Sequence, residues 1–250
     1  MKYLGVVQYL GAAYSGFQRQ KNAPTVQAEL EEKLSSVLGE PTQIKGAGRT
    51  DAKVNAKGQT FSFSYEKEIA DISSFIFAMN RLLPKDISLI SLREVPDAFD
   101  ARHSNCGKIY SYSFYFGKKD PFLSLTSAYI PYLPEKFDPK AFERALHVFL
   151  GKHDFRNFTA KEEDVDGFVR EIRRIELKEE KPMHFRVLFE GNGFMTYMIR
   201  FLIGGAMKVG LGKLSVEELS ALLEQRPRHI VAYNAAPEGL CLEEVLYEGI

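Results

Sequence analysis

The sequence has few cysteines, no net charge and no long apolar run. Its two cysteines, Cys106 and Cys241, lie far apart and without metal-ligand spacing, so neither a disulfide framework nor a zinc site is predicted. No apolar segment reaches the length that crosses a membrane, and Met1-Lys2-Tyr3 leads directly into a predicted strand rather than a signal peptide. These absences favour a cytoplasmic protein.

The charge balance excludes a strongly basic protein. Lys and Arg number 33, as do Asp and Glu, so any nucleic-acid surface must arise by gathering positive side chains on one face. The histidines show no metal-ligand or catalytic-triad spacing, and His153-Asp154 is predicted to be a loop pair. No P-loop or dinucleotide-binding fingerprint is present. These patterns give no support to metal-dependent or nucleotide-dependent chemistry.

Hydrophobic periodicity and capping residues predict two runs of elements in the order β-α-β-β-α-β. The first run has strands at 3–9, 43–47, 60–65 and 87–95, with one helix that opens at Pro24-Thr25 and is stopped by Gly39 and Pro41, and a second that opens at Asp71. The second has strands at 108–116, 169–178, 184–189 and 240–247, with helices opening at Asp138-Pro139 and spanning 194–209, and an extra helix after the capping box at Ser215. Each run has the order of a ferredoxin-like fold. The sequence therefore predicts an α+β protein with two ferredoxin-like halves, 1–105 and 106–250.

The segment Gly46–Ala56 places an arginine and an aspartate among glycines and other small residues. It leads into Gln59–Tyr65, where polar and aromatic side chains alternate as in a half-buried strand. We therefore expect Asp51 in a loop before a strand, where Arg49 could hold its carboxylate ionised. A plain surface turn is the alternative, because Gly, Thr and Asp are common turn formers.

Gly48-Arg49-Thr50-Asp51-Ala52, followed by Val54 and Ala56, resembles the signature of the TruA family of tRNA pseudouridine synthases. The resemblance extends from Tyr3 to Tyr247 and implies that Asp51 is the catalytic carboxylate. Two positions depart from the family pattern: Lys53 stands where the family has Gly, and Asn55 where it has His. Lys53 bears on the local backbone, because lysine tolerates positive φ poorly.

Arg200 lies in the apolar segment Phe194–Ile203. A charge there is costly unless it is paired, which favours burial with a partner over a guanidinium that reaches water along the helix surface. Met198-Ile199-Arg200, with Gly204 after it, is similar to the family segment whose arginine pairs with the catalytic aspartate. The resemblance therefore implies an ion pair between Asp51 and Arg200.

Further matches imply contacts with the substrate. Tyr110 reads by itself as a core aromatic of a strand, but the resemblance implies that its ring packs against the target base. Tyr14–Gln20 is similar to a family loop and makes Arg19 a candidate phosphate contact, with a solvated loop arginine as the alternative. Lys53 and Asn80, the latter in Asn80–Pro84, are further candidates for RNA contact, and Arg49 for the backbone of the flipped nucleotide.

The resemblance implies isomerisation of uridine to pseudouridine in the anticodon stem-loop of tRNA, at tRNA positions 38–40. It also implies a homodimer, no cofactor, and two sheets joined side by side with the active site in a cleft between them. Asp51 would act as a nucleophile or as the base of a glycal route. One alternative is a non-catalytic RNA-binding protein on ferredoxin-like sheets, against which stands the lack of an RNP1-like run. Another is a Mg²⁺-dependent phosphotransferase, which needs further carboxylates that Gly46–Ala56 lacks.

Overall fold

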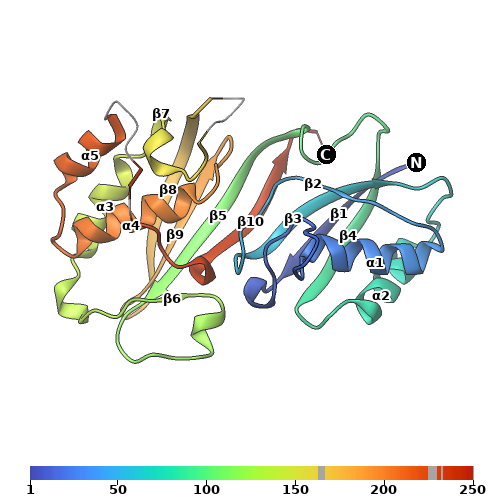
Figure 1. The fold of residues 1–250 in the computed structure, drawn as a ribbon, viewed down its shortest axis with the longest axis horizontal. Coiled ribbons are helices and arrows are strands. Elements are labelled where there is room, and N and C mark those ends of the chain that lie inside the picture. The colour runs from blue at the N-terminus through green and yellow to red at the C-terminus, as the bar shows by residue number, and fades with distance from the viewer. Residues whose placement is uncertain (163–166, 225–229, 232, 250) are drawn as a thin grey trace. The chain divides into compact units, whose positions relative to one another are not determined.

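The computed structural model of this chain describes residues 1–162, 167–224, 230–231 and 233–249 (Figure 1). It forms two compact units: unit 1 comprises Met1–Cys106 with Cys241–Ile250, and unit 2 comprises Gly107–Leu240. The first segment of unit 1 ends at residue 106, and the last strand also belongs to unit 1. Cys241 and Leu242 pair in parallel with Asn55 and Ala56, and this backbone pairing attaches the last strand to unit 1.

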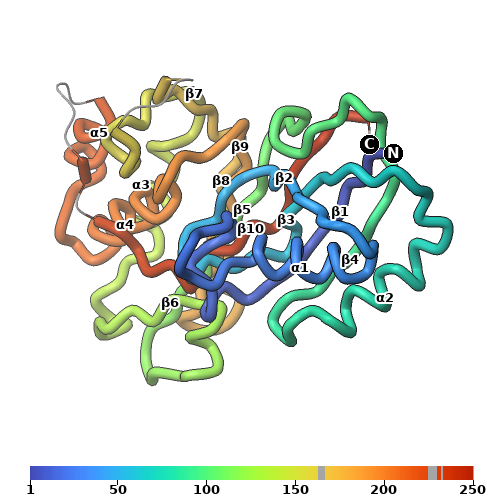
Figure 2. The backbone as a smooth tube through the Cα atoms, turned by 45° about the vertical axis from the view of Figure 1, so that its right-hand side comes forward, coloured from blue at the N-terminus to red at the C-terminus, as the bar shows by residue number. Residues whose placement is uncertain are grey.

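Unit 1 contains one sheet and two α-helices among its described residues. Its elements are β1 (Lys2–Tyr9), α1 (Val26–Leu38), β2 (Lys45–Gly46), β3 (Asn55–Ser64), α2 (Ile72–Leu82), β4 (Ile87–Val95) and β10 (Leu240–Tyr247). β1 lies between β4 and β3 and is antiparallel to both, and β2 pairs antiparallel with β3. This sheet order, with α1 and α2 in contact with each other, is the predicted ferredoxin-like arrangement (Figure 2).

Local signals set the helix ends of unit 1 as predicted. α1 ends at Gly39, which takes a left-handed φ of 75°. Asp71 caps α2 by accepting a hydrogen bond from the backbone N–H of Ser74. β3 differs from the prediction, because it begins at Asn55 instead of residue 60. The Asp51 loop therefore enters the sheet almost at once, which limits how far it can move.

Unit 2 has its own strands and helices. Its elements are β5 (Asn105–Tyr115), β6 (Ala128–Tyr129), α3 (Pro139–His147), β7 (Gly151–Asp154), β8 (Val169–Lys181), β9 (His184–Gly191), α4 (Met198–Gly210) and α5 (Val216–Glu224). The strand order is β5-β9-β8-β7, with antiparallel neighbours. β5 begins within unit 1 and continues into this sheet. Phe114 on β5 packs against the rings of Phe137, Phe142 and Phe185 and marks the core.

Two predictions for unit 2 need correction. His153-Asp154 was predicted as a loop pair, but the two residues end the short strand β7, which pairs with β8. The helix predicted over 194–209 begins only at Met198, because Tyr197 takes a left-handed φ of 60° that a continuing helix excludes. None of the helices in the described part of the chain is long and apolar enough to span a membrane.

Candidate functional site

Asp51 lies in the loop between β2 and β3, and backbone hydrogen bonds hold both ends of this loop. The N–H of Ala47 donates to the carbonyl of Thr60 (2.9 Å), and the N–H of Val54 donates to the carbonyl of Asp51 (3.2 Å). Asp51 is half-buried, whereas Arg49 and Lys53 on either side of it are exposed. The segment is a turn that a backbone hydrogen bond anchors to the sheet.

The residues on either side of Asp51 are held by a side chain of β1 and by the backbone of the segment that follows β1. The Tyr9 hydroxyl and the Thr50 Oγ1 atom form a buried hydrogen bond of 2.7 Å. The Phe17 N–H donates to the Thr50 carbonyl (3.1 Å), and the Lys53 N–H donates to the Tyr14 carbonyl (3.1 Å). Burial raises the pKa of Tyr9 well above its usual value, so its hydroxyl stays protonated. Asp51 thus stands between two residues whose backbones are fixed.

The two departures from the family pattern have structural explanations. Lys53 has a φ of 65°, the left-handed conformation that suits the glycine of the family signature. Asn55 is only 4% exposed, and its Oδ1 atom accepts a hydrogen bond of 2.8 Å from the Gly11 N–H. A Cβ atom at Gly11 would lie 2.2 Å from the Val54 carbonyl oxygen, so this approach requires glycine. Asn55 therefore fastens the start of β3 to the chain after β1.

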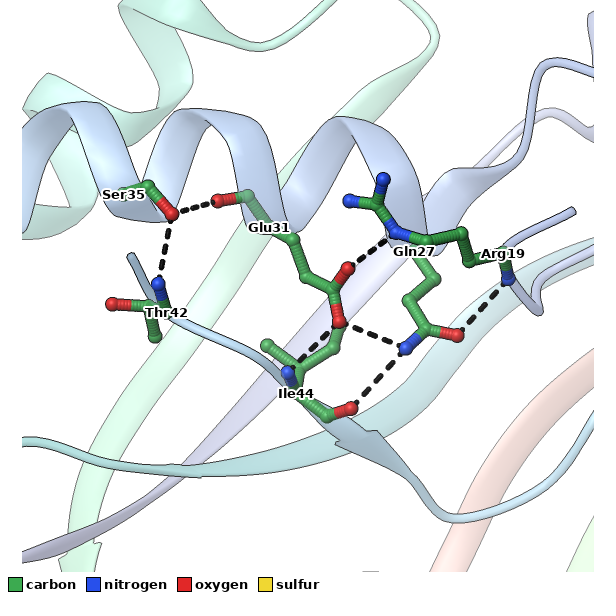
Figure 3. A network of polar contacts seen from close by, with 6 residues as sticks. All are labelled: Arg19, Gln27, Glu31, Ser35, Thr42 and Ile44. Carbon is green, nitrogen blue, oxygen red and sulfur yellow. Dashed lines mark hydrogen bonds and ion pairs between the residues drawn. The ribbon is translucent and has the colours of Figure 1, made fainter. Parts of the chain in front are cut away.

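Arg19 lies in the segment between β1 and α1 and forms an ion pair. Its Nε atom donates to the Glu31 Oε2 atom on α1 (2.7 Å), while 54% of the Arg19 side chain is exposed (Figure 3). The guanidinium group is therefore held at its Nε edge, and about half of the side chain is open to solvent. Its contact with an RNA phosphate stays a prediction.

Asn80 is exposed near the end of α2, and its amide bonds to the neighbouring strand. The Nδ2 atom donates to the Leu89 carbonyl (2.9 Å), and the Oδ1 atom accepts from the Leu89 N–H (2.7 Å). The side chain pairs with β4 in the way that a backbone peptide would. This contact explains the residue as a tether between α2 and β4, and its predicted RNA contact stays a prediction.

Tyr110 is a buried residue of β5 in unit 2. It is 8% exposed, and its ring meets the ring of Phe194 edge to face, with centroids 5.3 Å apart. The interpretation as a core aromatic of a strand is confirmed. Phe194 precedes α4, so Tyr110 lies next to the segment that leads to Arg200.

Arg200 is half-buried on the first turn of α4 and has partners within unit 2. Its Nε atom donates to the Ala235 carbonyl (2.6 Å), and its guanidinium lies 4.8 Å from the centre of the Tyr197 ring. The Ala235 N–H donates back to the Arg200 carbonyl (3.0 Å). A Cβ atom at Gly204 would lie 2.0 Å from the Tyr233 carbonyl oxygen, so glycine is needed for this chain segment to approach α4.

The predicted site residues divide between the two units. Asp51, Arg49, Lys53, Arg19 and Asn80 belong to unit 1, whereas Tyr110 and Arg200 belong to unit 2. The Asp51–Arg200 ion pair and the cleft both stay predictions. Among the described residues, no group of three or more His, Cys, Asp or Glu side chains is placed to hold a metal ion.

Sequence reasoning missed the residues that hold the Asp51 loop and Arg19. Tyr9 and Thr50 lie 41 residues apart, so no local pattern links them. Glu31 did leave a signal: it follows Leu30 and precedes Leu34 on the buried side of α1. A carboxylate at such a position requires a partner, which a helical projection of α1 would have shown.

Comparisons with known proteins agree on one family. The family profile described as tRNA pseudouridine synthase matches residues 6–104 and 145–248. The chain is 35% identical over 243 residues to tRNA pseudouridine synthase A of Clostridium kluyveri, covering 97% of this chain and 98% of that protein. It is 36% identical over 250 residues to the protein of the same name from Streptococcus equi subsp. equi, covering 99% of each. A chain of the Cbf5-Nop10-Gar1 complex matches 82% of this chain and 45% of its own length, with 15% identity and a TM-score of 0.38.

Proposed function

Since the chain belongs to the tRNA pseudouridine synthase family, we propose that it converts uridine to pseudouridine in tRNA, with Asp51 as the catalytic carboxylate. The observation that carries this proposal is the similarity to proteins of that name along 97–99% of the chain. The anchored loop around Asp51 supports it, because a reacting carboxylate has to be held in one position.

The reaction rearranges one nucleotide and needs no added atoms. The bond between N1 of uracil and C1′ of ribose breaks, the base turns, and C5 bonds to C1′ while the C5 proton is lost and N1 gains one. Asp51 would attack C1′ or remove a ribose proton on a glycal route, and both roles use an ionised carboxylate. No oxidant, reductant or group donor enters this balance, so we propose catalysis without a cofactor.

The target base has to leave its stack to reach a carboxylate. We propose that Tyr110 packs against the flipped uracil, and that Arg49 contacts the backbone of the same nucleotide or occupies the space it vacates. Arg200 would support the ionised form of Asp51, because an opposite charge lowers the pKa of a carboxylate. The proposed targets are the uridines at tRNA positions 38–40 in the anticodon arm, and the proposed assembly is a homodimer.

Contacts with the phosphate backbone of tRNA would come from exposed cations of unit 1. Arg19 and Lys53 are both exposed, which suits contact with phosphates. Since the chain has no net charge, such contacts require a local positive surface. Binding of tRNA should therefore weaken steeply as salt rises, whereas a flat dependence of Kd on salt would contradict this surface.

One assay tests the proposed function. The purified protein is incubated with unmodified tRNA transcripts and a chelator, and pseudouridine is measured at each position. We expect product at positions 38–40 with wild-type protein and none with Asp51→Asn. Binding of tRNA without product would favour the non-catalytic RNA-binding alternative. Product that disappears with the chelator would contradict the metal-independent reaction.

A further inference from the structure

Glu31 is a buried carboxylate in the middle of α1 in unit 1. The residue is 7% exposed. A carboxylate taken out of water is costly unless ion pairs and hydrogen bonds replace its hydration. Its contacts therefore show what the fold gains from placing a charge there.

Both carboxylate oxygens of Glu31 are engaged by segments outside its own turn of helix. The Oε1 atom accepts from the Ile44 N–H (3.1 Å) and from the Nε2 atom of Gln27 (2.9 Å). The Oε2 atom accepts from the Nε atom of Arg19 (2.7 Å), as Figure 3 shows. One side chain thus connects α1, the segment before α1 and the segment before β2.

The contact with Ile44 is part of a series along α1. Ser35 Oγ accepts from the Thr42 N–H (2.9 Å), and Gln27 Nε2 donates to the Ile44 carbonyl (3.2 Å). Side chains of the helix therefore bind the backbone at 42–44 as a neighbouring strand would. This segment continues directly into β2 and then into the Asp51 loop.

The contact with Arg19 fixes a long and otherwise flexible side chain. The Arg19 backbone N–H also donates to Gln27 Oε1 (3.0 Å), so both ends of the residue are held. The Glu31 carboxylate engages the Nε edge of the guanidinium, whereas phosphate is commonly bound by a pair of parallel N–H groups. Arginine has five N–H donors, so the two terminal nitrogens can still donate to an RNA phosphate.

We infer that Glu31 is a positioning residue for tRNA binding: it holds Arg19 in the orientation that receives a backbone phosphate. This inference rests on the proposed function, because it takes tRNA as the ligand. A negative charge beside Arg19 weakens its long-range attraction for phosphate, so Glu31 benefits binding only through orientation. That difference separates positioning from a purely structural role.

A double-mutant cycle with full-length protein tests the inference, with KM for a tRNA transcript and Kd by direct binding as readouts. Glu31→Gln keeps the size of the side chain and its oxygen for the Ile44 N–H. Its amide group, however, would face the Arg19 Nε–H, donor against donor. We expect Arg19→Ala to raise KM and Kd about tenfold, the loss of one charge-assisted contact, and Glu31→Gln about fivefold. In the Arg19→Ala background, Glu31→Gln should change neither by more than about twofold.

Glu32→Gln is the matched control. It removes the same charge from the next position of α1, where the carboxylate is exposed and pairs with Lys33. We expect its KM to stay within about twofold of wild type. Melting temperatures of all variants show whether the fold is retained, and kcat of Glu31→Gln should stay within about twofold because the Ile44 contact remains.

The outcomes separate the inference from the proposed function. An equal rise of KM with Glu31→Gln in both backgrounds, or no rise in the wild-type background, would overturn the positioning role. Wild-type protein that binds tRNA but makes no pseudouridine would overturn the proposed function, and the cycle measured in Kd would still decide the role of Glu31.

Discussion

The segments around Asp51 and Arg200 carry two of the charges that sequence patterns singled out, and each is held differently within its own unit. Around Asp51 the neighbouring residues are fixed: Thr50 by hydrogen bonds to the Tyr9 hydroxyl and the Phe17 N–H, and Lys53 by a hydrogen bond to the Tyr14 carbonyl. At Arg200 the side chain itself is fixed, by the Ala235 carbonyl and by the face of Tyr197.

This difference follows from the lengths of the two side chains. Aspartate has only two rotatable side-chain bonds, so a fixed backbone leaves its carboxylate only a few rotamers. Arginine is much longer and loses more rotamer freedom on ordering, so its guanidinium needs partners of its own. A loop with many hydrogen bonds is therefore the fitting support for Asp51, and an acceptor at the end of the side chain is the fitting support for Arg200.

The largest effect is expected at Asp51 itself. Asp51→Asn and Asp51→Ala should lower kcat by about 10³-fold or more, because no other group would replace the carboxylate. The Kd for tRNA should stay within about threefold of wild type, since phosphate contacts dominate binding. Single-turnover assays and direct binding measure the two quantities. Turnover near wild type in Asp51→Ala would exclude the assignment.

Arg200→Ala should come next in size. We expect kcat to fall about 10²-fold if Arg200 supports the ionised Asp51. The free energy of unfolding should fall by about 1–2 kcal/mol, because the bond to Ala235 and the contact with Tyr197 are both lost.

Arg200→Lys is the control for charge. It keeps the cation but loses the planar group, so activity should be reduced rather than absent. Normal activity of Arg200→Ala would show that Arg200 contributes only to the packing of α4. The pH dependence of kcat adds a second readout, because loss of a cation that stabilises the carboxylate should move the acidic limb to higher pH.

Tyr9→Phe tests whether fixing the Thr50 side chain matters for the position of Asp51. It removes the bond to Thr50 and leaves the Thr50 hydroxyl buried without that partner, which should cost about 1–2 kcal/mol of stability. We expect kcat to fall about fivefold, since a slightly mobile loop positions Asp51 less well. Tyr14→Phe is the matched control: it removes a bond to Asp86 (2.7 Å) and leaves the backbone bond between Tyr14 and Lys53 in place. Equal losses of kcat in both variants would argue against a specific role for Tyr9.

The smallest effect is expected at Lys53, where the backbone has a left-handed φ that is unfavourable for lysine. Lys53→Gly should raise the free energy of unfolding by about 0.5–1 kcal/mol, because relief of strain exceeds the added freedom of the unfolded chain. Lys53→Ala loses the same cation but keeps the strain. Both should weaken tRNA binding by about twofold to threefold. A rise in melting temperature with both variants would show that backbone strain is not the cause.

Elements with local signals were predicted well. The caps at Asp71 and Asp138 and the left-handed Gly39 mark helix ends in the sequence, and all three lie where expected. β3 was predicted too short, because the polar residues Asn55 and Gln59 are buried by contacts with distant parts of unit 1, where Asn55 bonds to Gly11. β7 was missed because four residues carry little periodicity, and only pairing with β8 makes them a strand.

Neighbouring residues were enough to predict the order of most elements and the ends of the capped helices, and the resemblance to a family supplied the candidates Asp51, Tyr110 and Arg200. These features depend on neighbours within a few residues or on a motif read in order. Tertiary structure alone decided that β10 belongs to unit 1, that Arg19 pairs with Glu31, that Asn80 bonds to Leu89 and that Ala235 holds Arg200. The physical reason is that a polar side chain accepts many alternative partners, and only folding brings one of them within hydrogen-bond distance.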